Sequence, residues 1–138
     1  MKKSILAFIL GLLVWAVVVT LINRGLRIGI PGYVAAERSL DFTLGMKIGR
    51  LLMAALASLA AGAVAGKMTG STTRVAWILG AVLLAVFVPV HVQLWAKFPV
   101  WYHLTFLLTL APLVALGATL TRNPCIASSR MSESKALN

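Results

Sequence analysis

The fold is decided by a stretch that carries no charged residue over 22 positions, residues 75–96, which reads VAWILGAVLLAVFVPVHVQLWA. A single lysine, Lys97, separates it from a second uncharged stretch of 24 residues, 98–121. An α-helix needs about 20 consecutive apolar residues to cross the roughly 30 Å hydrocarbon core of a bilayer. Each stretch is therefore long enough for one transmembrane helix, and the short connection predicts two antiparallel neighbours.

Two further apolar stretches lie upstream. Residues 4–23 are uncharged over 20 positions, whereas residues 51–66 are uncharged over only 16. Sixteen helical residues cover about 24 Å, so this span must extend upstream and bring Lys47 or Arg50 into or to the edge of the bilayer. We predict four membrane spans, near residues 5–23, 42–67, 74–95 and 99–121.

The composition supports the same class of protein. Of the 138 residues, 60% are hydrophobic and 12% are charged, whereas soluble domains are about 45–50% apolar and about 25% charged. The apolar stretches are continuous and do not alternate, which argues against the strands of a membrane barrel. The prediction is an all-α integral membrane protein with four transmembrane helices in an up-down antiparallel bundle, residues 1–121. A polar and disordered tail, residues 122–138, is expected to follow.

The orientation follows from the basic residues of the connections. Lysine and arginine in short connections mark the cytoplasmic side, and an even number of spans puts both termini on one side. The side of the termini carries seven basic residues and the other side six, or four if Lys47 and Arg50 belong to the span. We therefore expect a multi-pass protein of the bacterial inner membrane with both termini in the cytoplasm.

The net charge of +10 arises from basic residues on both sides of the predicted bundle. This scatter indicates contact with anionic lipid at the membrane surface and not the binding of nucleic acid. The first apolar stretch follows Lys2 and Lys3, as in a secretory signal, but it is longer than the apolar region of a signal and no small-residue cleavage site follows it. We expect it to be retained as the first span.

Small residues recur at four-residue intervals along the second predicted span, from Ala54 to Gly66, and Gly45 with Gly49 forms a separate pair at the same spacing. Such rows let helix backbones approach closely in lipid, where no hydrophobic force drives helices together. The row indicates packing within the bundle or between copies of the chain. The candidate packing residues are Gly45, Gly49, Ala54, Ser58, Gly62 and Gly66.

Polar residues of three spans are predicted to share one level. Arg50 continues the small-residue row, His91 lies about one turn before the end of the third span, and His103 lies about one turn after the start of the fourth. Ionisable groups inside a membrane are costly and mark functional sites by default. Arg50 must be neutralised by Asp41, by Glu37 in the connection, by helix carbonyl groups or by an external anion.

Each of these residues also has a simpler explanation. Arg50 can extend to lipid phosphate, Asp41 can be the N-cap of its helix, and each histidine can be a single hydrogen-bonding core residue. The aromatic residues at 95–102 are typical of a belt at the bilayer interface, or form a stacking wall for a planar ligand. The candidate ligand-binding residues are Arg50, His91, His103, Lys47, Asp41, Trp95, Trp101 and Tyr102.

The only long connection runs from Arg24 to Asp41. Within it, residues 30–32 read Ile-Pro-Gly, which predicts a turn. Residues 33–40 can then form a short helix on the membrane surface. Such a helix would cap the polar level of Arg50.

The sequence favours a protein that is not an enzyme. It has no carboxylate pair and no nucleophile or metal-hydrolase motif, and we expect no cofactor and no metal. The first hypothesis is a bundle that binds an anionic or polar small molecule, or a lipid headgroup, near the non-cytoplasmic face. The second is an accessory or assembly subunit of a larger membrane complex. The row of small residues is also compatible with a homo-oligomer. A more remote hypothesis makes His91 and His103 the axial ligands of a haem.

In length and hydropathy the chain is similar to two families of small four-span proteins, the small multidrug-resistance transporters and the fluoride channels. The likeness does not extend to motifs. The first span lacks the acidic residue that the transporters require, and the Gly-rich and Thr/Phe-rich motifs of the channels are missing. No residue role is therefore carried over from either family.

Overall fold

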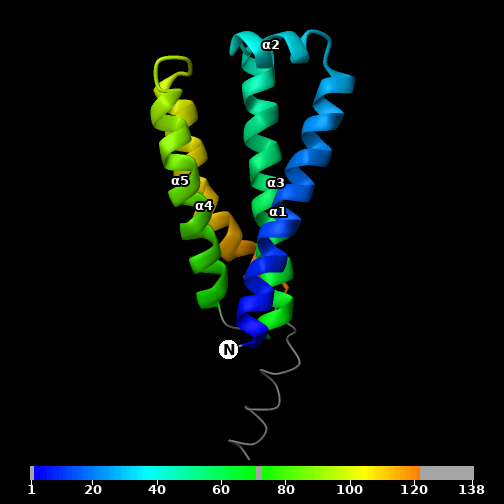
Figure 1. Ribbon diagram of the computed structural model, residues 1–138, viewed down its shortest axis with the longest axis vertical. Coiled ribbons are helices and arrows are strands. Elements are labelled where there is room, and N and C mark those ends of the chain that lie inside the picture. Colours follow the sequence, from blue (N-terminus) through cyan, green and yellow to red (C-terminus); the bar gives the residue numbers. More distant parts are fainter. Residues whose placement is uncertain (1, 71–72, 122–138) are drawn as a thin grey trace, which may run out of the picture.

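The computed structural model describes residues 2–70 and 73–121, and the predicted tail, 122–138, lies outside the described residues. The described chain forms four long helices and one short helix (Figure 1). In chain order these are α1 (Lys2–Gly29), α2 (Tyr33–Ser39), α3 (Leu44–Thr69), α4 (Thr73–Gln93) and α5 (Val100–Leu120).

The four long helices are each long and apolar enough to cross a membrane. They run alternately up and down, with the N-terminus at one end of the bundle and α2 at the other (Figure 1). The connection between α4 and α5 lies at the same end as α2. The prediction of an all-α bundle with four long apolar helices is therefore confirmed.

Helix α1 is longer than its predicted span. It continues six residues beyond position 23 and ends at Gly29, where Pro31 and the left-handed Gly32 (φ 79°) follow. Proline lacks the amide hydrogen that would continue the helix, and glycine tolerates this positive φ. A helix of 28 residues is about 42 Å long, against a hydrocarbon core of roughly 30 Å. Its last turns, with Asn23 and Arg27, therefore extend past the length that a span requires.

The predicted short helix is present as α2, which lies across the end of the bundle between α1 and α3 (Figure 1). The proposed capping role of Asp41 is wrong, because α3 begins three residues after it, at Leu44. The N-cap is Thr43, whose side-chain oxygen accepts a hydrogen bond from the Met46 amide at 3.4 Å. Threonine serves this position well since its hydroxyl satisfies an otherwise unpaired helical N–H.

Helix α3 is the centre of the packing, and its glycines contact the backbone of α5. A Cβ added to Gly62 would overlap the carbonyl oxygen of Val114, and one added to Gly66 would lie 2.6 Å from Ala118 Cα. On the other helix, a Cβ at Gly117 would overlap the carbonyl of Leu59. Two backbones in direct contact are typical of small-residue helix crossings in membranes.

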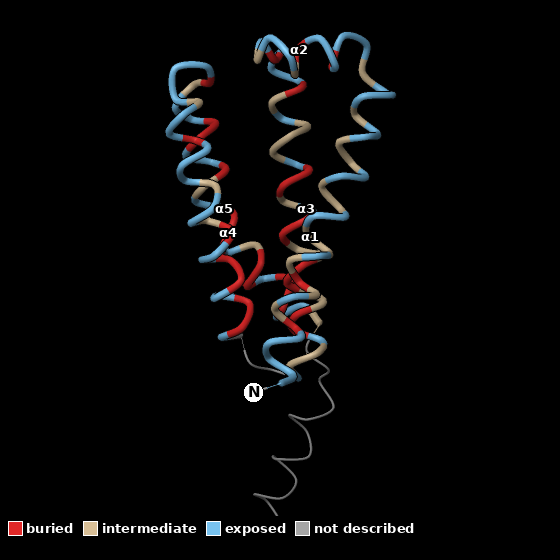
Figure 2. Tube along the Cα trace, in the orientation of Figure 1, coloured by how far each residue is buried: buried red, intermediate tan, exposed pale blue. Residues whose placement is uncertain are grey.

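A buried serine links α3 to α1. Ser58 donates a hydrogen bond to the Ala54 carbonyl at 2.7 Å and accepts one from Trp15 Nε1 at 3.3 Å. Both hydrogen-bonding roles of this buried hydroxyl are therefore filled within the bundle. Away from this contact α1 is mostly exposed, whereas buried residues are frequent where α3, α4 and α5 meet (Figure 2).

The upper glycines of α3 lie differently from Gly62 and Gly66. Gly49 faces the side chain of Leu26 on α1, because a Cβ added to this glycine would lie 3.5 Å from Leu26 Cδ2, an ordinary contact distance. Gly45 is exposed, and a Cβ there would meet nothing within 4 Å. Gly49 therefore packs against α1, whereas Gly45 faces no other described residue.

Candidate functional site

Arg50 lies about two turns into α3, and its side chain reaches the segment around α2. Its Nη1 donates a hydrogen bond to the Tyr33 hydroxyl at 3.3 Å and lies 3.7 Å from Glu37 Oε1. Its guanidinium carbon lies 4.8 Å from the centroid of the Phe42 ring, within the range of a cation–π contact. The side chain is 29% exposed, so the guanidinium group is held at the end of the bundle by α2 and the residues after it.

Glu37 is the carboxylate at the centre of this polar network. It accepts a hydrogen bond from Arg27 Nε at 2.7 Å and another from Asn23 Nδ2 at 3.2 Å. The Tyr33 hydroxyl donates to Asn23 Oδ1 at 3.1 Å. The Glu37 carboxylate therefore links α2 to the end of α1 and to Arg50 of α3.

The other predicted charged residues at this end stand apart from the network. Asp41 is exposed, and its backbone amide donates to Ser39 Oγ at 3.4 Å. Lys47 is half-buried, and its side chain makes no hydrogen bond or ion pair with any described residue. Of the two carboxylates considered for Arg50, the structure brings Glu37 to it.

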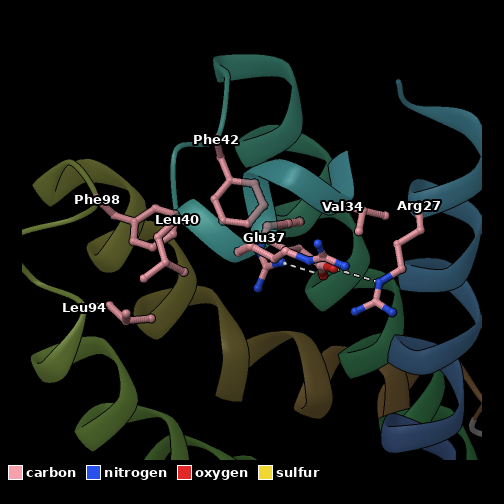
Figure 3. Close-up of a pocket in the computed structure, with 9 residues that line it drawn as sticks. Arg27, Val34, Glu37, Leu40, Phe42, Leu94 and Phe98 are labelled. Atoms are coloured by element: carbon pink, nitrogen blue, oxygen red, sulfur yellow. Dashed lines mark hydrogen bonds and ion pairs between the residues drawn. The ribbon is translucent and has the colours of Figure 1, made fainter. Parts of the chain in front are cut away.

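A cavity of about 460 Å³ opens beside this network, and we call it the arginine cavity (Figure 3). Its charged walls are Arg27, Arg38, Arg50 and Glu37, so three cationic side chains surround one anionic side chain. Leu94 and Phe98, both from the connection between α4 and α5, form part of the apolar wall. Figure 3 shows Arg27 and Glu37 joined across the cavity, with these two apolar side chains on the opposite side.

Two smaller cavities adjoin Arg50 further into the bundle. One of about 70 Å³ is lined by His91 and His103 and shares Arg50 with the arginine cavity; we call it the histidine chamber. The other, of about 150 Å³, lies among apolar side chains that include Trp15 and Met53. Arg50 lines all three, so it stands where the end of the bundle meets the interior.

The two histidines lie against each other in the histidine chamber. Both are buried, and their ring centroids are 5.1 Å apart. His91 Nδ1 lies 3.1 Å from the Phe87 carbonyl oxygen. His91 Nε2 and both ring nitrogens of His103 are buried and have no hydrogen-bond partner among the described residues.

Aromatic rings hold the histidines in place. Trp95 stacks on His103 with centroids 4.8 Å apart, and Tyr102 is parallel to His91 at 6.2 Å. Tyr102 is buried, whereas Trp95 and Trp101 are about half exposed. Trp101 contacts the edge of Tyr102 at 6.1 Å. Neither Trp95 nor Trp101 lines any of these cavities, so Tyr102 is the candidate aromatic residue that borders the chamber, together with Phe87, Phe98 and Phe106.

The haem hypothesis does not fit this geometry. The space shared by His91 and His103 is about 70 Å³, which is far smaller than a porphyrin. The residues described also contain no cluster of three or more His, Cys, Asp or Glu side chains that could hold a metal ion. We therefore derive no redox or metal chemistry from this site.

Sequence reasoning placed Arg50 and the histidines at one level but did not single out Arg27 and Arg38. The spacing of residues along the sequence contained a signal for part of the polar network around Glu37. Asn23 and Arg27 are four residues apart, as are Tyr33 and Glu37, so each pair lies on one face if its segment is helical.

Comparison of the chain with protein-family models, with curated proteins and with solved structures gives no match. The class of protein therefore rests on the helices themselves. Four long apolar helices that pack together define a multi-pass helical protein with four candidate membrane spans. The function is then inferred from the charged side chains that line the arginine cavity.

Proposed function

We propose that this protein is a non-enzymatic membrane protein that binds a molecule with a phosphate or carboxylate group in the arginine cavity. The observation that carries the proposal is the excess of cationic side chains, since Arg27, Arg38 and Arg50 share the cavity with the single carboxylate of Glu37. Guanidinium groups bind such anions through paired, charge-assisted hydrogen bonds. The ligand belongs either to a lipid headgroup or to a soluble anion.

The cavity retains free hydrogen-bonding capacity for an anion. Glu37 is bonded to Arg27 at 2.7 Å, but it lies 3.7 Å from Arg50, which is beyond hydrogen-bond distance. Tyr33 takes one donor of Arg50, and a guanidinium group has several more. The side chain of Arg38 makes no polar contact with the described residues. Both Arg38 and Arg50 therefore have donors available to a ligand.

The position of the cavity suits a headgroup. It lies at the end of the bundle beside the last turns of α1, which extend past the length that a span requires. Anionic headgroups lie at this level of a bilayer and attract basic side chains. With both termini in the cytoplasm, as the basic residues of the sequence suggest, the cavity lies at the non-cytoplasmic face of the inner membrane.

A titration of the purified protein in mild detergent tests the proposal. Native mass spectrometry would follow binding of phosphatidate, of zwitterionic phosphatidylcholine and of inorganic phosphate. We expect a preference of at least about tenfold for phosphatidate over phosphatidylcholine, and a similar loss of phosphatidate binding in Arg50→Gln, because one charge-assisted contact is worth about 1.5–3 kcal/mol. Binding of inorganic phosphate in place of phosphatidate would identify the soluble source.

The matched control is Arg24→Gln, which removes the same charge from an exposed residue of α1 that does not line the cavity. Arg38→Gln is the second test variant, since Arg38 is exposed and its loss leaves the network of Glu37 intact. Equal losses in Arg24→Gln, Arg38→Gln and Arg50→Gln, or no preference for an anion in the wild type, would contradict the proposal.

A further inference from the structure

The histidine chamber contains hydrogen-bonding groups that the bundle does not use. His91 is 6% exposed and His103 is 0% exposed, yet three of their four ring nitrogens have no partner among the described residues. An unpaired buried polar group is costly, and nearly all such groups in proteins are paired with protein or with a bound molecule. We therefore expect the chamber to hold a bound group that forms hydrogen bonds with these ring nitrogens.

The size of the chamber limits the occupant. It measures about 70 Å³, which is room for a few water molecules. A small polar group therefore fits, whereas a long acyl chain does not. The chamber shares Arg50, Leu94 and Phe98 with the arginine cavity, so such a group can belong to the molecule bound there.

The chemistry of the walls narrows the group further. A neutral imidazole carries one hydrogen-bond donor and one acceptor, so two histidines together offer both. The remaining walls are apolar or aromatic, apart from the Arg50 guanidinium group and the Tyr102 hydroxyl group. A cationic group would be repelled by the Arg50 guanidinium. A hydroxyl group, which both donates and accepts, matches these walls.

We infer that the ligand of the arginine cavity carries a hydroxyl group close to its phosphate, and that His91 and His103 bind this hydroxyl group. The inference rests on the proposed function and specifies its ligand. The chemical class is a phosphate ester of a polyol, either as the headgroup of a lipid or as a free ester.

The experiment compares ligands of equal charge that differ in hydroxyl groups. The lipid pair is phosphatidylglycerol against phosphatidylethanol, and the soluble pair is glycerol phosphate against ethyl phosphate, each titrated by native mass spectrometry. We expect about a tenfold preference for the hydroxyl-bearing member of one pair, and the pair that shows it identifies the source. In His103→Phe and in His91→Leu the preference should fall to about one.

The control is Gln93→Leu, which removes a polar side chain from an exposed position two residues after His91; it should keep the preference. If neither pair shows a preference for its hydroxyl-bearing member and binding still depends on Arg50, the inference is overturned and the proposed function stands. If no anionic ligand binds, the inference and the proposed function are both overturned. A preference that survives both histidine substitutions would also overturn the inference. The wild-type comparison needs no variant, so a histidine variant that fails to fold does not prevent the test.

Discussion

Replacing Gly62 with alanine is expected to disrupt the bundle, although it adds a single methyl group. The new Cβ would overlap the carbonyl oxygen of Val114, and a backbone carbonyl in a helix cannot move aside as a side chain can. Helices α3 and α5 would have to separate along their whole contact. We expect a loss of about 2–3 kcal/mol in the free energy of unfolding, at the upper end of the usual cost of overpacking.

The matched control for this substitution lies on the same helix. A Cβ at Gly45 would meet nothing within 4 Å, so Gly45→Ala should leave stability unchanged or raise it by up to about 1 kcal/mol, because alanine favours a helix over glycine. The measurement is a thermal melt in detergent, followed by circular dichroism. Equal melting temperatures for the two variants would contradict the backbone contact between α3 and α5.

Replacing Glu37 with glutamine is expected to change stability and anion binding in opposite directions. The variant loses the ion pair with Arg27, whose side chain is 52% exposed, and solvent limits this loss to about 1 kcal/mol. It also leaves three arginines around the arginine cavity with no carboxylate among its lining residues. Affinity for phosphatidate should then rise by about tenfold, equivalent to about 1.4 kcal/mol, since a competing negative charge has been removed.

The control for Glu37→Gln is Asp41→Asn, which removes one negative charge from an exposed residue outside the arginine cavity. It should alter neither the melting temperature nor the affinity appreciably. The affinities come from the same titration, and the melting temperatures from the same detergent solution. Weaker anion binding in Glu37→Gln, or an equal gain in Asp41→Asn, would show that Glu37 does not compete with the ligand.

The four long apolar helices were predictable because the cost of placing charge in hydrocarbon leaves long uncharged stretches in the sequence of a membrane protein. The close contact of α3 with α5 was predictable in kind, since Gly62 and Gly66 continue a row of small residues. The partner helix was not, because a row of small residues specifies close approach and not the surface that approaches.

The arginine cavity was only partly predictable, because hydropathy does not show where a helix ends. Hydrophobicity reports where a chain can leave the bilayer, but it does not report whether the helix continues there, as α1 does to Gly29. That continuation brings Arg27 next to Glu37, on the same face of α1 as Asn23. The N-cap was missed because Asp41 and Thr43 are both good capping residues, and only the position where α3 begins distinguishes them.

Native mass spectrometry of the protein as purified from its membrane, with Arg50→Gln and Arg38→Gln alongside, is the decisive test of an anion site. We expect the wild type to retain a phosphate- or carboxylate-bearing molecule and both variants to lose most of it. A wild-type protein that carries no such molecule, or variants that retain it fully, would contradict an anion site in the arginine cavity. Purification with a second protein and without a small molecule would instead favour an accessory subunit of a larger membrane complex.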